Sequence, residues 1–96
     1  GKIGGFCHLY IGQEACGIGS ISVLRPDDMV IGSYRTHVQA FLKGIPPEQV
    51  LAELYGKSGG AVKGKGGSMH MFSKEHEFYG GHGIVGGQIG VATGMA

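Results

Sequence analysis

Several residue types are absent or scarce in this chain, and each absence narrows the range of functions. The 96 residues contain no tryptophan, three prolines and only two cysteines, Cys7 and Cys16. Two cysteines at this spacing form neither a dense disulfide framework nor the Cys-x-x-Cys pattern of a metal or redox site, and neither lies in a motif that would activate a nucleophilic thiol. We therefore expect a protein of a reducing compartment.

Charge is also sparse. Charged residues make up 16% of the chain, and eight Lys and Arg nearly balance seven Asp and Glu, for a net charge of +1. The lysines gather around one glycine-rich loop and form no long basic stripe, so we expect no nucleic-acid partner. No apolar run approaches the roughly 20 residues that a bilayer-spanning helix needs, so we expect no membrane partner either.

Glycine, in contrast, is abundant. The chain has 21 glycines in 96 residues, well above the usual level of about 7%, and they lack the every-third spacing of collagen. Many fall in two motifs: residues 63–71 read KGKGGSMHM and residues 78–86 read FYGGHGIVG. Glycines beside Lys63 and Lys65 leave backbone N–H groups approachable and bring two ammonium groups close together, which is typical of an anion-binding loop.

Periodicity and turn residues predict alternating helices and a strand. The expected elements are a helix over 13–24, a buried parallel strand at 29–31, a helix capped by Ser33 and stopped at Gly44, a helix from Pro46 to Tyr55, and a ligand-holding loop over 57–67. In the first helix, Gly17 and Gly19 indicate close packing against a neighbour. Residues 91–96 are typical of a helix that continues, and Gly1 is no initiator methionine, so we expect an internal fragment.

Two glycine spacings raise the alternative of a non-catalytic nucleotide-binding module. Residues 59–65 match the spacing of a phosphate-binding loop, but Gly66 stands where Ser or Thr should bind magnesium. Residues 81–86 match the dinucleotide pattern Gly-x-Gly-x-x-Gly, but the chain ends before the acidic residue expected about 20 positions later. Both spacings are weak evidence when they stand alone.

Two further features contain polar residues that fit either a binding role or a purely structural one. Tyr34 and Arg35 follow a short strand where a helix should begin, and free N–H groups there, with a phenol and a planar guanidinium, suit a diphosphate. An isolated Tyr-Arg pair could equally be an exposed Arg beside a packed Tyr. His8, beside Cys7 and the apolar Leu9, would by itself be read as a packed histidine.

Taken together and in order, the motifs resemble one family. Residues 5–9 read GFCHL, residues 12–15 read GQEA and residues 33–37 read SYRTH, and these precede the two glycine motifs. In this order they resemble the alpha subunit of the pyruvate dehydrogenase first component, a thiamine diphosphate enzyme. Relatives that act on branched-chain 2-oxo acids or on acetoin share much of this layout and remain alternatives.

The resemblance implies a fold and a reaction. It implies an α/β fold, the N-terminal part of a thiamine diphosphate-binding fold with a parallel sheet flanked by helices, and it makes residues 1–96 a partial dehydrogenase domain truncated at both ends. The implied activity is the oxidative decarboxylation of pyruvate with acetyl transfer to lipoamide. The fragment alone is expected to be inactive.

The resemblance also assigns site residues. Tyr34 and Arg35 are expected to bind the cofactor diphosphate, and backbone groups at Gly83 and Val85 to meet the aminopyrimidine ring. Ser73 is expected to contact the cofactor, and His8 is predicted as the catalytic residue, lining the cofactor and substrate pocket.

Partners and a metal follow from the same resemblance. A beta subunit in a heterotetramer, a lipoyl-bearing acyltransferase component and pyruvate are the expected partners, and the beta subunit is expected to supply the activating glutamate. Magnesium is expected as a second cofactor, with its ligands beyond Ala96 and none within this chain. His70, His76 and His82 follow a six-residue spacing that fits no zinc site. The implied location is the cytoplasm of a bacterium, or the mitochondrial matrix of a eukaryote.

Overall fold

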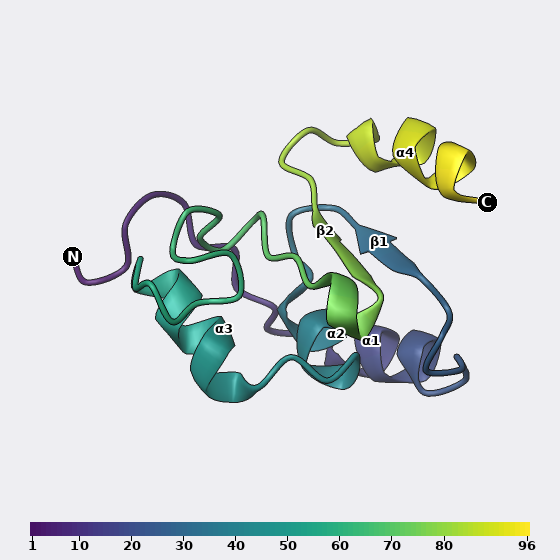
Figure 1. The fold of residues 1–96 in the computed structure, drawn as a ribbon, viewed down its shortest axis with the longest axis horizontal. Coiled ribbons are helices and arrows are strands. Elements are labelled where there is room, and N and C mark those ends of the chain that lie inside the picture. The colour runs from purple at the N-terminus through teal and green to yellow at the C-terminus, as the bar shows by residue number, and fades with distance from the viewer.

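The computed structural model describes residues 1–96 and contains one sheet of two short parallel strands. The elements, in chain order, are α1 (Glu14–Ile21), β1 (Val30–Gly32), α2 (His37–Leu42), α3 (Pro47–Leu54), the 3-10 turn η1 (Lys74–His76), β2 (Phe78–Gly81) and α4 (Gly87–Met95). In Figure 1, α1 and α2 lie below the strands and α4 lies above them. The expected α/β class with a parallel sheet is confirmed.

The two strands bring distant parts of the chain together. Val30 pairs with Phe78 and Gly32 with Gly81, with one irregularity between these pairs because β2 is longer than β1. The predicted strand at 29–31 is thus confirmed within one residue, as Val30–Gly32. Strand β2 was not predicted from the sequence, because a four-residue run with two glycines has little strand propensity. Parallel strands end at the same edge of a sheet, so the segments that follow Gly32 and Gly81 start side by side.

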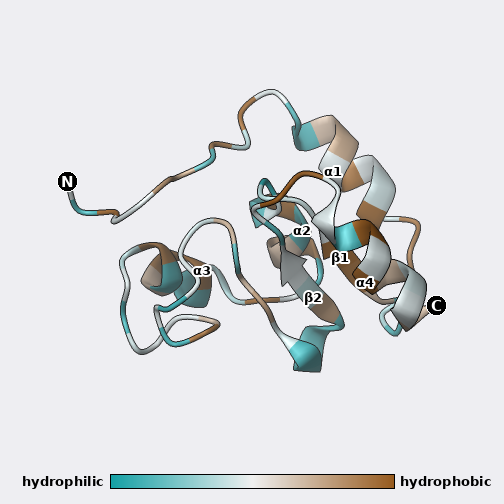
Figure 2. Ribbon diagram, turned by 90° about the horizontal axis from the view of Figure 1, so that it is seen from above, coloured by the Kyte–Doolittle hydropathy of each residue, from teal (hydrophilic) through white to brown (hydrophobic).

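A small apolar core lies between the sheet, α2 and α3. Its buried members are Val30, Ala40, Ile45, Val50, Met71 and Phe78, and Ile21, Leu54 and Ala61 pack against it. Viewed from above, α3 and the loop after it lie on one side, while α1 and α4 lie on the other (Figure 2). No helix combines the length and the apolar character that crossing a membrane requires.

Helix α1 is shorter than predicted, covering Glu14–Ile21 instead of 13–24, because the Leu24 N–H donates to the Ile21 carbonyl in a turn. Gly17 is buried where α1 meets its neighbours: a Cβ there would lie 2.6 Å from the Tyr10 hydroxyl and 3.0 Å from Val38. The predicted close packing is therefore confirmed at Gly17. It is wrong at Gly19, where a Cβ would meet no atom within 4 Å.

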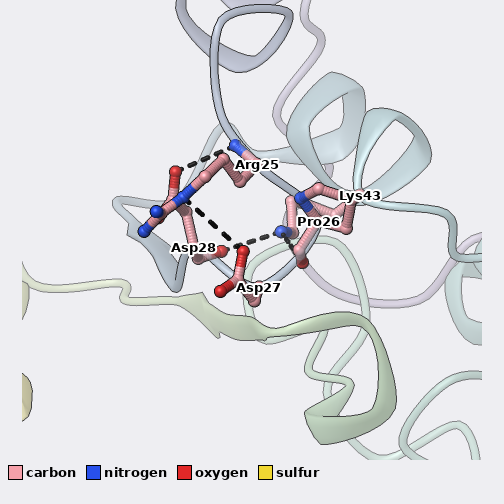
Figure 3. Close-up of polar contacts among 5 residues, drawn as sticks. All are labelled: Arg25, Pro26, Asp27, Asp28 and Lys43. Atoms are coloured by element: carbon pink, nitrogen blue, oxygen red, sulfur yellow. Dashed lines mark hydrogen bonds and ion pairs between the residues drawn. The ribbon is translucent and has the colours of Figure 1, made fainter.

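The segment between α1 and β1 is hydrogen-bonded to Lys43 at the C-terminal end of α2. The Lys43 ammonium donates to the carbonyls of Pro26 and Asp28, at 2.9 and 2.8 Å (Figure 3). Asp28 accepts the Arg25 backbone N–H at 2.9 Å and its guanidinium at 3.1 Å, and these bonds hold the pKa of Asp28 below its ordinary value. This cluster fixes the turn that leads directly into β1.

Helix α2 begins later than predicted. Its first residue is His37 with Thr36 as N-cap, so Ser33 is not the cap and Tyr34 and Arg35 precede the helix. The Ser33 carbonyl instead accepts the N–H of His82, at 3.1 Å, and this bond to the segment after β2 holds residue 33 outside the helix. The predicted helix start at Ser33 is therefore wrong, and Tyr34 and Arg35 lie next to one another just before the helix.

Helix α3 has nearly the bounds that its proline and glycine residues predict, whereas α4 begins earlier than expected. The start of α3 at Pro47 and its end before Gly56, which has a φ of 65°, confirm the expected bounds closely. Of the large apolar residues over 50–55, Val50 is buried and Leu54 packs against the core, whereas Leu51 and Tyr55 are exposed. Helix α4 begins at Gly87, four residues before the apolar segment in which a helix was expected.

Candidate functional site

The site is built at the edge of the sheet where both strands end. Tyr34 and Arg35 follow β1 closely, and His82 and Gly83 follow β2 directly. The His82 N–H donates to the carbonyls of Gly32 and Ser33, at 3.1 Å each, which joins the two segments. The edge formed by the carboxyl ends of parallel strands is where ligands bind in open α/β sheets.

A third segment adds His8 to this edge. The His8 and Tyr34 rings lie 4.5 Å apart between centroids, and the Arg35 guanidinium carbon lies 5.1 Å from the centre of the Tyr34 ring. Arg35 Nε donates to the carbonyl of Leu9 at 3.2 Å, which ties the N-terminal segment to the strand end. Residues separated by 26 positions in the chain thus form one cluster of an imidazole, a phenol and a guanidinium.

The donors in this cluster suit an anion with several oxygens. Within the chain, Arg35 uses only Nε, so its two terminal nitrogens remain available, and the Tyr34 hydroxyl makes no hydrogen bond within the chain. A planar guanidinium offers parallel N–H groups to phosphate oxygens, and a phenol adds one further donor. The chemistry of this donor set therefore fits a diphosphate.

Gly83 lies in the second part of the site. It lines a cavity of about 400 Å³ with His70, His82, Ile84 and Gly87. A Cβ added at Gly83 would lie 3.4 Å from His70 Cε1, an ordinary contact, so the fold itself leaves room for a small side chain there. Val85 does not line this cavity, and its side chain is 80% exposed.

The structure does not bring Ser73 to this cluster. Ser73 lies beside Phe78, the first residue of β2, whereas Gly83 lies beyond the last. Its hydroxyl forms a 2.7 Å hydrogen bond with His76 Nδ1. Any contact of Ser73 with a ligand at the strand ends would have to reach across the length of β2.

Ser68 is a residue that sequence reasoning missed. Its side chain is 3% exposed, and its hydroxyl accepts the backbone N–H of His8 at 3.0 Å. The His37 ring approaches the same hydroxyl at 2.9 Å and the Ser68 carbonyl at 3.0 Å, both through Nε2. Burial lowers the pKa of His37 most, the hydrogen bond to the Ser68 carbonyl raises it, and the nearby His8 lowers it, so that the pKa lies below its ordinary value and the neutral ring is favoured.

Glu53 is a second missed residue, and it corrects the anion-binding interpretation of the glycine and lysine loop. The Glu53 side chain on α3 is fully buried, and Oε2 accepts the N–H groups of Val62 and Gly64, both at 2.9 Å. Oε1 accepts those of Gly66 and Gly67, at 2.7 and 3.0 Å. The loop does form an anion cradle, but the anion it holds is this carboxylate. The phosphate-loop interpretation of residues 59–65 fails for the same reason.

Burial and hydrogen bonding act on Glu53 in opposite directions. Burial raises the pKa of a carboxyl group, but the four backbone N–H donors together outweigh burial and hold the pKa of Glu53 below its ordinary value. The only signal in the sequence was a Glu on the face of α3 that also carries Val50. That spacing alone does not distinguish a buried acid from an exposed one.

The three histidines discussed for zinc are separated in space. His70 and His82 line the cavity beside Gly83, and His70 Nδ1 lies 3.1 Å from the Gly81 carbonyl oxygen, whereas His76 belongs to η1. No group of three or more His, Cys, Asp or Glu side chains is placed to hold a metal ion. The dinucleotide spacing over 81–86 does join β2 to α4, which is the context that such a pattern needs.

Comparison with known proteins distinguishes these interpretations. The family model described as Dehydrogenase E1 component matches residues 1–96. The chain is 58% identical to the pyruvate dehydrogenase E1 component subunit alpha of Rhizobium meliloti (strain 1021), over 100% of this chain and 28% of that protein.

Two more relatives carry similar names. The chain is 55% identical to the corresponding subunit of Rickettsia prowazekii (strain Madrid E), over 100% of this chain and 29% of that protein. It is 53% identical to the mitochondrial subunit of Sminthopsis macroura, over 98% of this chain and 25% of that protein. The chain thus spans less than a third of the length of these relatives. The resemblance drawn from the motifs is confirmed, and the chain belongs to the dehydrogenase E1 component family.

Proposed function

We propose that this chain is part of the alpha subunit of a pyruvate dehydrogenase first component, which decarboxylates pyruvate oxidatively and transfers the acetyl group to lipoamide. The proposal extends the names of relatives that match the whole chain but of which the chain covers less than a third. We also propose that residues 1–96 form part of a larger thiamine diphosphate-binding domain. The gathering of His8, Tyr34 and Arg35 at the carboxyl edge of the sheet is the observation that carries the cofactor assignment.

Each residue has a role set by its chemistry. Arg35 and Tyr34 hold the diphosphate, and His8 lies next to them to donate to phosphate or to the substrate carboxylate. Backbone groups at Gly83 and Val85 face the aminopyrimidine ring, where the lack of a side chain at Gly83 leaves room for it. Ser73 is kept as a weaker cofactor contact, acting through its backbone. When bound, thiamine diphosphate supplies the decarboxylating chemistry, and these groups bind and orient it.

The remaining components come from elsewhere. Magnesium is proposed as the second cofactor, with ligands outside these residues, because no group of three suitable side chains exists here. We propose a beta subunit in a heterotetramer and a lipoyl-bearing acyltransferase as partners, in keeping with relatives named as alpha subunits. The bacterial and mitochondrial relatives support the bacterial cytoplasm or the mitochondrial matrix as the location.

Calorimetry on the full-length alpha subunit, co-expressed with its beta subunit, tests the cofactor. We expect thiamine diphosphate with magnesium to bind, and ATP and NAD not to bind. Binding of ATP or NAD without thiamine diphosphate would favour the nucleotide-binding module that the 81–86 spacing suggested. Comparison of kcat/KM for pyruvate, a branched-chain 2-oxo acid and acetoin then tests the substrate, and a preference for either of the latter two would contradict the pyruvate assignment.

A further inference from the structure

Ser68 joins three segments that are far apart in the sequence. It follows the glycine and lysine loop directly, its side chain is 3% exposed, and its one hydroxyl reaches both His8 and His37. The partners lie 60 and 31 positions away in the chain. A small polar side chain that is almost fully buried and satisfied by two distant partners holds those partners in fixed relative positions.

The two hydrogen bonds of the hydroxyl are compatible with each other. Its oxygen has two lone pairs, so it can accept both the His8 backbone N–H at 3.0 Å and an N–H at His37 Nε2 at 2.9 Å. His37 Nε2 also lies 3.0 Å from the Ser68 carbonyl oxygen, which can only accept, so Nε2 carries a proton in this arrangement. The burial of His37, which lowers its pKa, favours the neutral ring, whose single proton then lies on Nε2.

Ser68 is itself held from the other side. The N–H groups of the two preceding residues, Gly66 and Gly67, donate to Oε1 of Glu53 at 2.7 and 3.0 Å. Because Glu53 is fully buried on α3, the backbone leading into Ser68 is anchored in the interior of the molecule. The position of Ser68 is therefore set by the core and not by the exposed N-terminal segment.

The segment that carries His8 has few other attachments. Residues 1–7 are exposed, and the bonds that tie the chain around His8 to the body are the Ser68 bond and the one from Arg35 to the Leu9 carbonyl. We propose that Ser68 is a positioning residue, which fixes the backbone of His8 so that its ring stays against Tyr34. The proposal rests on the proposed function, in which His8 and Tyr34 face the cofactor.

A double-mutant cycle in the full-length alpha subunit assembled with its beta subunit tests this inference. Ser68→Ala removes the hydroxyl, and the nearly isosteric Ser68→Cys keeps the space filled while weakening the hydrogen bonds. We expect each variant to weaken thiamine diphosphate binding about threefold to tenfold, the range for one neutral hydrogen bond. Ser58→Ala is the matched control, because Ser58 lies exposed in the same loop and makes no side-chain hydrogen bond. It should leave the affinity unchanged.

The cycle distinguishes positioning from a general structural role. If Ser68 acts through His8, the Ser68→Ala change should have no further effect on affinity in a His8→Ala background. An equal loss in both backgrounds, or no loss in the wild-type background, would overturn the inference. If His8→Ala alone leaves the affinity unchanged, the assignment of His8 in the proposed function fails, and the positioning role falls with it.

A second measurement needs no cofactor. Hydrogen exchange of the His8 amide in the cofactor-free protein should become faster in both Ser68 variants and stay unchanged in Ser58→Ala, since only the former lose the acceptor of that N–H. Unchanged exchange in Ser68→Ala would show that the serine does not hold this backbone. This readout keeps the inference testable even if cofactor binding is lost in every variant.

Discussion

At the scale of single residues, Arg35 is the donor with the clearest prediction. Its Nε–H donates a hydrogen bond to the Leu9 carbonyl, and its remaining N–H groups are free to bind a ligand. Arg35→Lys should weaken thiamine diphosphate binding by about 1.5–3 kcal/mol, because a single ammonium cannot serve the carbonyl and the diphosphate together. Calorimetry on the assembled enzyme measures the change. Arg25→Lys, which keeps the positive charge beside Asp28 and lies outside the group of His8, Tyr34 and Arg35, is the control. Equal affinities of the Arg35 variant and wild type would remove Arg35 from the site.

A substitution at Gly83 should affect ligand binding and folding differently. A Cβ there would make only an ordinary 3.4 Å contact with His70, so Gly83→Val should fold with little change in the thermal unfolding temperature. We expect it to weaken cofactor binding about tenfold or more, because its methyl groups enter the space assigned to the aminopyrimidine ring. Gly59→Val, where a Cβ meets nothing within 4 Å, should leave the affinity close to wild type. Wild-type binding by folded Gly83→Val would mean that this glycine only forms a turn.

Substitution of Glu53 should change the stability of the protein and the dependence of that stability on pH. Glu53→Gln replaces one acceptor oxygen with an NH₂ group, which leaves two backbone N–H groups facing a donor. Two lost charge-assisted bonds should cost about 3 kcal/mol or more in the free energy of unfolding, measured by denaturant titration. Glu48→Gln, on the exposed first turn of α3, should cost little. A cost for Glu53→Gln as small as that of the control would show that the loop does not depend on the carboxylate.

The pH dependence follows from the direction of the pKa shift. The pKa of Glu53 in the folded protein lies below its ordinary value of 4.5, so the stabilisation is fully present above that value. It is lost as the pH falls through the folded pKa. The difference in unfolding temperature between wild type and Glu53→Gln should therefore shrink in acid and stay constant from pH 5 to pH 7. A difference that grows as the pH falls would contradict this sign.

At the scale of elements, the turn before β1 depends on a side chain from α2. Lys43 donates to the carbonyls of Pro26 and Asp28, so Lys43→Met should loosen the chain that enters β1. We expect a loss of about 1–2 kcal/mol in the free energy of unfolding, since the ammonium is only partly buried. Lys57→Met, at an exposed lysine whose hydrogen bonds involve only its backbone, is the matched control. Equal unfolding free energies for the two variants would show that this link contributes nothing.

The position of α2 shows how a contact between elements overrides a local signal. Ser33 is a favourable capping residue, yet the helix begins at His37, because the Ser33 carbonyl is bonded to His82 from the other strand end. The same bond brings the two motif segments together. Ser33, which local propensity would place at the start of a helix, thus joins the ends of the two strands where the candidate site lies.

At the scale of the whole molecule, much apolar surface is left uncovered. Only 12 of 96 residues are buried, α4 buries none, and Phe6, Ile11, Ile84 and Val85 are each at least 77% exposed. We expect the 96-residue chain, produced alone, to bind an apolar dye strongly, because so large an exposed apolar surface is unusual for an isolated domain. It should neither bind thiamine diphosphate tightly nor decarboxylate pyruvate, because its donor cluster is open to water and no metal ligands accompany it. Tight binding or robust turnover by the purified chain would contradict this.

The sequence by itself determined the family and some of the local elements. The order of short motifs such as SYRTH and FYGGHGIVG was enough to identify the family, because each motif is contiguous and specific. Pro47 and Gly56 bounded α3 correctly, since proline and glycine act on the backbone where they stand. The strand at β1 was predicted for a similar reason, as a short apolar run between turn residues.

Only the tertiary structure decided which distant groups meet. The burial of Glu53, the place of Ser68 between His8 and His37, and the pairing of β2 with β1 all depend on contacts across many positions of the chain. No local spacing encodes such contacts, because an acid or a serine has the same sequence pattern whether it faces water or the interior. The loop that was predicted to bind an external anion instead binds the Glu53 carboxylate from α3, because packing places this carboxylate within hydrogen-bond distance of four backbone N–H groups.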